Sequence, residues 1–388
     1  MRRTLPQAPK RDSPGKLLLD VTPQKDCGCS RLPNPSQDWL ARLEQGWLMD
    51  QRSIILTVGF GSVMINTMPV WIGDLASGAG LSDGIAGAFA SLVLLSASLA
   101  CLGLRDAEYI SLSKVAAPIC LALLALSPPS APLLPALACC GLGIAIGALT
   151  GRVISGLDGQ SGKLAAISLA LSAGLVVSLL VYLILLVLTL SSLWLLTAMS
   201  LGLLAVRTPQ MAPSSRFQWN HFTSALPVQY IPFFVMMGAY WTYLELFGAR
   251  FDNAGQLPFW LLGSLVTGAI GAFLASRIPP SWQARTQAWA MVAAAVTGGC
   301  SYLAPNLALF GLTILVNGFA LFVYFPLYLG TVGDKAPGAM AGYLLGFAVG
   351  GAVGSALIFS VGYTALAGAI LLSGLIGLMQ SGVRSHPR

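Results

Sequence analysis

The sequence predicts an all-α membrane protein, with twelve transmembrane helices in two pseudo-symmetric bundles of six. Composition is the first reason: 56% of the 388 residues are hydrophobic and only 9% are charged, whereas a soluble domain carries about 25% charged residues. The apolar runs are the second reason, because continuous runs of about 20 residues suit helices rather than the short alternating strands of a barrel. The third is the alternation of basic loops along the chain.

The N-terminal segment, residues 1–52, is basic, contains several prolines and has no apolar run. We interpret it as a largely disordered cytosolic extension without a signal peptide. Within it, Asp38–Met49 predicts an amphipathic helix on the membrane surface; the alternative is a plain lead-in to the first span. Cys27 and Cys29 suit a soft metal by their chemistry. Because the chain has only two histidines, we expect no bound metal and no cofactor.

Apolar runs divide the rest of the chain into two bundles, over 53–206 and 227–380, joined by a cytosolic linker over 207–226 and followed by a tail over 381–388. The predicted spans are 53–74, 84–104, 112–128, 132–153, 163–188 and 190–206, then 227–249, 257–277, 287–303, 306–329, 338–359 and 361–380. The block over 163–206 is interpreted as two helices with a tight TLSS turn. The alternative is one tilted span followed by a re-entrant piece.

The basic residues test this count, because cytosolic loops near membrane helices are enriched in Lys and Arg. With a cytosolic N-terminus, Arg250 alone falls in an outside loop. The inside loops contain Arg105, Lys114, Arg152, Lys163, Arg207, Arg216, Arg277, Arg285, Lys335, Arg384 and Arg388. Adding or losing one helix would scramble this alternation, so we expect both termini in the cytoplasm.

Three glycine-rich segments carry a family resemblance: DLASGAGLSDGIAGAFASLVLLSASLACLGL from Asp74, GAIGAFLASRIPPSWQAR from Gly268, and AGYLLGFAVGGAVGSALIF from Ala341. Together with the two equal blocks and the polar linker between them, they resemble the major facilitator superfamily. The resemblance covers essentially everything after residue 52. It implies a transporter of the bacterial inner membrane, not an enzyme, that binds a small molecule between two halves.

The same resemblance implies specific roles for loop residues. Arg105, Asp106, Arg277 and Arg285 match the family's cytosolic gating loops, and Gly268 and Gly271 allow close helix approach. Ser276 departs from the family pattern, which often has Asp there.

Candidate substrate contacts follow from the family layout, in which the first, fourth, seventh and tenth spans line a central cavity. They are the polar and aromatic residues near mid-span, namely Asn66, Tyr240, Trp241, Asn317 and Tyr324. Amides offer donors and acceptors, and aromatic faces stack on flat or cationic ligands. The alternative is that Asn66 and Asn317 form hydrogen bonds to neighbouring helices and hold the helices of the bundle together.

Acidic residues are absent from the predicted midplane of the membrane. A proton-coupled carrier needs an ionisable group within the membrane, and Glu245 is the first candidate and Asp74 the second. The alternative for Glu245 is an interfacial acid paired with Arg250. Arg152 could meet an anionic substrate, and its alternative role is that of a positive-inside anchor.

The leading functional hypothesis is a secondary transporter of a small neutral or amphipathic organic solute, with efflux favoured over uptake. The aromatic character of the second half fits such a solute. The chain has no Gly-x-x-x-x-Gly-Lys-Ser/Thr phosphate loop, which argues against an ATP-driven pump. We expect no nucleic-acid partner. The alternative is a non-transporting module, such as an assembly factor, that docks a protein partner through its N-terminal extension.

Overall fold

The computed structural model describes residues 52–80, 83–104, 107–128, 133–155, 163–188, 190–208, 230–248, 250–251, 256–331 and 336–382. The predictions made for the N-terminal extension, for the Cys27 and Cys29 pair, for Arg105 and Asp106, and for most of the linker lie outside these residues. Within them the regular structure is helical throughout.

Helices of the first half follow the predicted spans. They are Arg52–Asn66, α2 (Met68–Ala79), α3 (Asp83–Gly103), α4 (Ala107–Ala125), α5 (Leu133–Ser155), α6 (Lys163–Val187) and α7 (Ser192–Ala205). The block over 163–206 is therefore two helices, as interpreted from the TLSS turn. However, α7 has only 14 residues, fewer than the roughly 20 that cross a bilayer.

The first predicted span is broken at Thr67, between the helix Arg52–Asn66 and α2. Pro69 explains the break, because its ring nitrogen has no hydrogen to donate to a preceding carbonyl. The Trp71 indole crosses the break instead and donates to the Met64 carbonyl oxygen over 3.1 Å. This contact keeps the two helical pieces in register.

Helices of the second half are α9 (Ile231–Gly248), α10 (Leu257–Ala275), α11 (Pro280–Ser301), α12 (Leu307–Thr331), α13 (Ala336–Ser360) and α14 (Tyr363–Gly382). The largest difference from prediction is the start of α11, which begins at residue 280 and not at 287. Pro280 at the first helical position is pre-organised for a helix start. The polar residues after it had hidden this first turn from a search for apolar runs.

Six helices in the described part of the chain are long and apolar enough to cross a membrane, by length and composition. They are Glu108–Ala125, Leu133–Gly151, Lys163–Val187, Leu257–Ala275, Leu307–Gly330 and Gly338–Ser360. Four shorter apolar helices are Arg52–Asn66, Gly87–Gly103, Ser192–Ala205 and Tyr363–Met379. The chain is thus a multi-pass membrane protein, and the count of twelve spans stays a prediction.

Glycines let the helices within each half approach closely. In the first half, a Cβ added at Gly147 of α5 would lie 2.2 Å from the Ala97 carbonyl oxygen of α3. In the second half, a Cβ at Gly271 of α10 would lie 2.5 Å from the Phe319 carbonyl oxygen, and one at Gly268 would lie 2.7 Å from the Phe322 ring. The close approach expected at Gly268 and Gly271 is confirmed.

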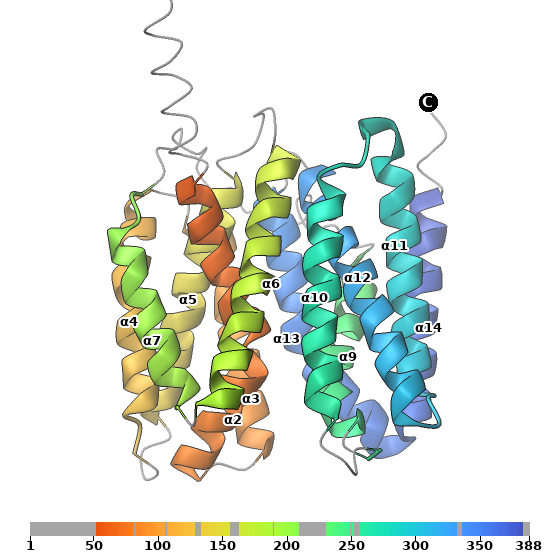
Figure 1. Ribbon diagram of the computed structural model, residues 1–388, viewed down its shortest axis with the longest axis horizontal. Coiled ribbons are helices and arrows are strands. Elements are labelled where there is room, and N and C mark those ends of the chain that lie inside the picture. Colours follow the sequence, from red (N-terminus) through yellow and green to blue (C-terminus); the bar gives the residue numbers. More distant parts are fainter. Residues whose placement is uncertain are drawn as a thin grey trace, which may run out of the picture. The chain divides into compact units, whose positions relative to one another are not determined.

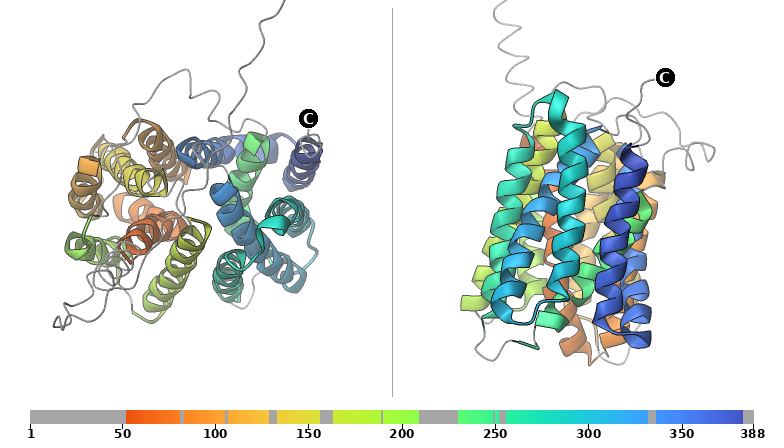
Figure 2. Two further views of the ribbon diagram at one scale, coloured as in Figure 1. Left: turned by 90° about the horizontal axis from the view of Figure 1, so that it is seen from above. Right: turned by 90° about the vertical axis from the view of Figure 1, so that its right-hand side faces the viewer.

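The helices gather in two groups, α2–α7 and α9–α14 (Figures 1 and 2). Contacts between the groups run mainly from α3 to α13 and from α6 to α10, which lie side by side in Figure 1. In the described part of the chain, hydrogen bonds from two serines join them. The Ser98 hydroxyl donates to the Ala341 carbonyl over 2.8 Å, and the Ser172 hydroxyl donates to the Ala269 carbonyl over 3.0 Å.

A third contact between the groups lies at the ends predicted to face the cytosol, where α6 begins and α12 ends. There a Cβ added at Gly330 would lie 3.4 Å from the Leu164 Cβ. The two halves are therefore in van der Waals contact at this end of the molecule.

Candidate functional site

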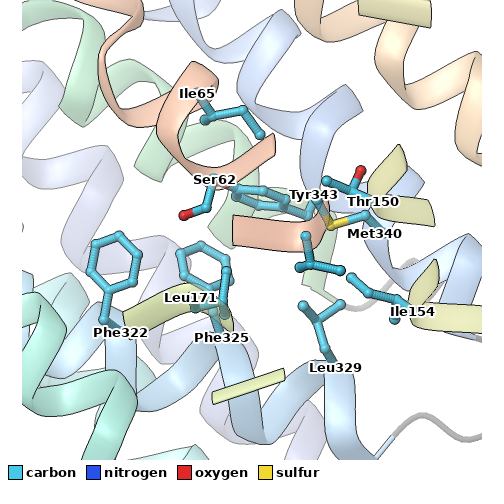
Figure 3. Close-up of a pocket in the computed structure, with 11 residues that line it drawn as sticks. Ser62, Ile65, Thr150, Ile154, Leu171, Phe322, Phe325, Leu329, Met340 and Tyr343 are labelled. Atoms are coloured by element: carbon cyan, nitrogen blue, oxygen red, sulfur yellow. The ribbon is translucent and has the colours of Figure 1, made fainter. Parts of the chain in front are cut away.

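A cavity lies between the two groups of helices (Figure 3). It holds about 460 Å³ of space, part of it open to the surroundings. Its walls are Val58, Ser62 and Ile65 of the first helix, Thr150 and Ile154 of α5, Leu171 of α6, Phe322, Phe325 and Leu329 of α12, and Met340 and Tyr343 of α13. Both halves of the chain therefore contribute to one site.

The wall of this cavity is apolar and aromatic, with no charged residue among the lining side chains that the structure describes. Phe325 and Tyr343 meet edge to face with their ring centroids 4.5 Å apart, and Phe322 lies 6.1 Å from Phe325. Ser62 and Thr150 supply hydroxyl oxygens (Figure 3). Such a surface can hold an apolar body by burial and orient it with few hydrogen bonds.

Asn66 lies next to this cavity, although it does not line it. Its side-chain amide donates to the Ser62 hydroxyl oxygen over 3.0 Å, and Ser62 is part of the cavity wall. Its backbone carbonyl accepts a hydrogen bond from the Tyr182 hydroxyl of α6 over 3.3 Å. Asn66 is thus joined to the cavity wall by a hydrogen bond.

Three other predicted contacts, Asn317, Tyr240 and Tyr324, are buried in the core of the second half and do not line the cavity. The Asn317 amide donates to the Ala294 carbonyl over 2.7 Å and to Thr297 over 3.2 Å, which ties α12 to α11. These contacts favour the alternative in which buried polar groups hold helices together.

Trp241, the remaining predicted contact, is half-buried. Its ring lies 5.8 Å from that of Tyr240, also in edge-to-face geometry. It does not line the cavity either. Its predicted role as a substrate contact therefore gains no support from this arrangement.

Aromatic side chains of α9, α12 and α13 form a packed cluster beside the cavity. The ring centroid of Phe234 lies 5.1 Å from that of Tyr328 and 5.8 Å from that of Tyr343. The ring centroids of Phe233 and Tyr324 lie 5.2 Å apart. Only Tyr343, of these five, lines the cavity. The aromatic character of the second half therefore serves core packing first and the cavity wall second.

Glu245 is exposed on α9. The suggested ion pair with Arg250 is absent in the described part of the chain. The Arg250 guanidinium lies instead over the rings of Tyr363 and Phe247, at 4.7 and 5.8 Å from their centroids.

Asp74, the second proton-coupling candidate, binds the start of α7. Its carboxylate accepts from the Ser192 backbone nitrogen over 2.6 Å and from the Ser192 hydroxyl over 2.5 Å. Ser191, which precedes Ser192 and is the N-cap residue of α7, makes no side-chain capping hydrogen bond. Since an anion is favourable at a helix N-terminus, Asp74 supplies the cap that α7 lacks.

Replacing Asp74 by alanine should therefore lower stability more than it changes transport. We expect Asp74→Ala to cost about 1.5–3 kcal/mol, the usual value of a hydrogen bond to a charged group. A thermal shift of the detergent-solubilised protein measures this. Initial transport rates at a temperature where the variant is folded are the companion measurement, and their complete loss would restore Asp74 as a coupling candidate.

The described gating-loop residues, Arg277 and Arg285, are exposed at the junction of α10 and α11. Each guanidinium lies over an aromatic ring of its own segment, Phe273 at 5.1 Å and Trp282 at 5.9 Å. Ser276, which replaces the family's Asp, donates to the Phe273 carbonyl over 2.7 Å and ends α10.

Sequence reasoning missed most of the cavity wall, including Ser62, Thr150, Met340 and Tyr343. These residues sit in spans that are apolar on every side, so no periodicity marks the face that looks inward. The one available signal was the small hydroxyl residues within the first and fourth spans, which are costly in lipid unless satisfied.

Comparison with known proteins identifies the architecture. No family model matches the sequence, and no curated protein sequence matches it. Among solved structures, the human organic anion transporter MFSD10 is similar with a TM-score of 0.65 at 15% identity, over 85% of this chain and 98% of that one. The E. coli fucose:proton symporter FucP is similar with a TM-score of 0.62 at 17% identity, over 86% of this chain and 98% of that one.

A structure of FucP in the outward conformation, described as a major facilitator superfamily transporter, gives the same TM-score of 0.62 at 16% identity. These neighbours are a transporter and a symporter. The structural similarity extends over nearly the whole length of each neighbour. The chain therefore has the fold of the major facilitator superfamily transporters.

Proposed function

We propose that this protein is a secondary transporter of the major facilitator superfamily for a small organic solute. The cavity walled by both halves is the observation that supports the proposal most directly. A site shared between two bundles can open to either side when the bundles rock, and this is how such folds move a solute without hydrolysing ATP. The proposal includes twelve spans with both termini in the cytoplasm.

The solute bound there is neutral or amphipathic in this proposal, because the described cavity wall is apolar apart from the hydroxyl groups of Ser62, Thr150 and Tyr343. Phe325 and Tyr343 provide stacking faces, and Ser62 and Thr150 provide oxygen atoms. Asn66 acts through Ser62. Efflux remains the favoured direction, and Glu245 remains the favoured coupling residue.

Filling the cavity should stop transport. Leu171 lines the cavity from α6, so we expect Leu171→Trp to reduce counterflow of the solute at least about tenfold by occupying the space it needs. Leu180 on the same helix is 51% exposed on the outer face, so Leu180→Trp is the matched control and should retain transport. Counterflow in proteoliposomes, with a panel of labelled organic solutes, measures both variants.

The proposal fails if no organic solute gives counterflow with the wild-type protein, or if the two tryptophan variants behave alike. Deleting residues 1–50 separates it from the non-transporting alternative. A transporter keeps counterflow after the deletion, whereas a docking module shows no counterflow before or after it and loses a bound partner.

A further inference from the structure

We propose that the exposed face at the start of α11 binds the head group of an anionic phospholipid. The ligand class is a lipid whose phosphate leaves the head group with a net negative charge, as in phosphatidylglycerol. None of the residues of this face is among the described residues that line the cavity. The inference therefore goes beyond the proposed transport function and does not depend on it.

Three large side chains share one face of α11 and remain exposed. Trp282 and Trp289 are 60% and 62% exposed, and Arg285 between them is exposed as well. Residues three and seven positions apart lie on the same side of a helix with 3.6 residues per turn. The opposite side, which includes Gln287 and Met291, is buried. The face that bears the two tryptophans is therefore left to the surroundings of the protein.

The position of this face along α11 matches the layer of lipid head groups. A rise of 1.5 Å per residue places Trp282 and Trp289 about 10 Å apart along the axis. Val296, which is 45% exposed, continues the same face into the apolar part of the helix. Head groups occupy roughly 5–8 Å on each side of the hydrocarbon core, and tryptophan favours this interface. Arg285, between the two indoles, is therefore placed at the level of the lipid phosphates.

The charge at this corner of the molecule is positive and is not neutralised by neighbouring acids. The stretch over 257–301, which spans α10 and α11, contains Arg277 and Arg285 and no acidic residue. Within the described part of the chain, neither guanidinium forms a salt bridge, and each lies over an aromatic ring. A phosphate group is the anion that a guanidinium binds with two parallel hydrogen bonds.

The ring beneath Arg285 orients it for such a bond. The guanidinium carbon lies 5.9 Å from the centroid of the Trp282 ring. A guanidinium that stacks on a ring keeps its N–H groups free at its edge, where they can bind phosphate oxygens. Trp289 and Val296 offer apolar surface to the acyl chains of the same molecule. A soluble anion would leave that surface uncovered, so the combination favours a lipid.

The test compares two lipids that have the same acyl chains and differ in charge. Purified full-length protein in detergent is titrated with phosphatidylglycerol or phosphatidylcholine, and bound lipid is counted by native mass spectrometry. We expect phosphatidylglycerol to bind at least about tenfold more tightly, because each arginine near the membrane surface contributes to this preference. A separate titration in the presence of inorganic phosphate should give the same affinity for phosphatidylglycerol.

Substitutions locate the preference on α11. Arg285→Gln should remove most of it, and Arg285→Lys should keep only part, because an ammonium group cannot form the paired bonds of a guanidinium. Arg207→Gln is the matched control. Arg207 is exposed beyond the end of α7, so this variant loses the same charge in the other half of the molecule and should keep the full preference.

Equal binding of the two lipids, an unchanged preference in both Arg285 variants, or an equal loss in Arg207→Gln would each overturn the inference. Competition by inorganic phosphate would also overturn it, because the site would then take a free anion rather than a lipid. Counterflow is measured separately. Its absence with every solute would reject the proposed function, whereas a selective loss of lipid binding in Arg285→Gln would still support the lipid site.

Discussion

A disulfide between α6 and α12 is expected to abolish transport in the double variant Leu164→Cys, Gly330→Cys. A Cβ at Gly330 would lie 3.4 Å from the Leu164 Cβ, and disulfides join Cβ atoms about 3.5–4.5 Å apart. These two helix ends belong to opposite halves. In a transporter that works by rocking, they must separate whenever the cavity opens to the cytosol, so a covalent bond should hold the protein in one state.

Counterflow before and after mild oxidation measures this effect, with dithiothreitol expected to restore the original rate. Each single variant is oxidised in parallel, because the chain has seven native cysteines. Mass spectrometry gives the fraction of cross-linked protein. Full counterflow in a sample that is entirely cross-linked would argue against rocking of the halves at this contact, whereas absence of the cross-link would show that the two helix ends are not in contact in the membrane.

The second large effect is expected for Gly147→Leu, which should prevent α3 and α5 from packing. The first added carbon alone would lie 2.2 Å from the Ala97 carbonyl oxygen and 2.8 Å from the Ala100 Cβ. Backbone atoms cannot move aside as a flexible side chain can, so the helices must separate. Overpacking of this kind costs about 1–3 kcal/mol, and more where backbone is displaced.

Gly202→Leu is the matched control for that substitution. Gly202 lies exposed on α7, and a Cβ added there meets no atom within 4 Å. Size-exclusion chromatography and thermal unfolding in detergent compare the two variants. We expect aggregated protein or a strongly lowered midpoint for Gly147→Leu and a normal profile for Gly202→Leu. Equal profiles would mean that close packing of α3 on α5 contributes little to stability.

Much of the secondary structure could be predicted because a membrane helix must satisfy its own backbone hydrogen bonds. This requirement forces long apolar runs, and those runs are visible in the sequence at α5, α6, α10, α12 and α13. The exceptions have local causes. Pro69 breaks the first span, and the polar first turn of α11 conceals the beginning of an otherwise apolar helix.

The candidate site could be predicted only in part. Asn66 stood out because polar groups are rare in apolar helices, and the fold places it beside the cavity wall. Asn317 stood out for the same reason, yet its amide binds α11 inside one half. The sequence signal was the same for Asn66 and Asn317, and the neighbouring helix made the difference.

From the residues alone one can infer that this chain enters a membrane, where most of its apolar helices lie, and which connecting segments carry positive charge. The packing of the helices was needed to show which residues face the cavity, that Asp74 caps α7, and that Asn317 binds α11. The physical reason is that lipid and protein interior are equally apolar surroundings for a side chain. When a helix is apolar on every side, its sequence therefore does not show which face packs against the protein and which faces lipid. Only the positions of the neighbouring helices show this.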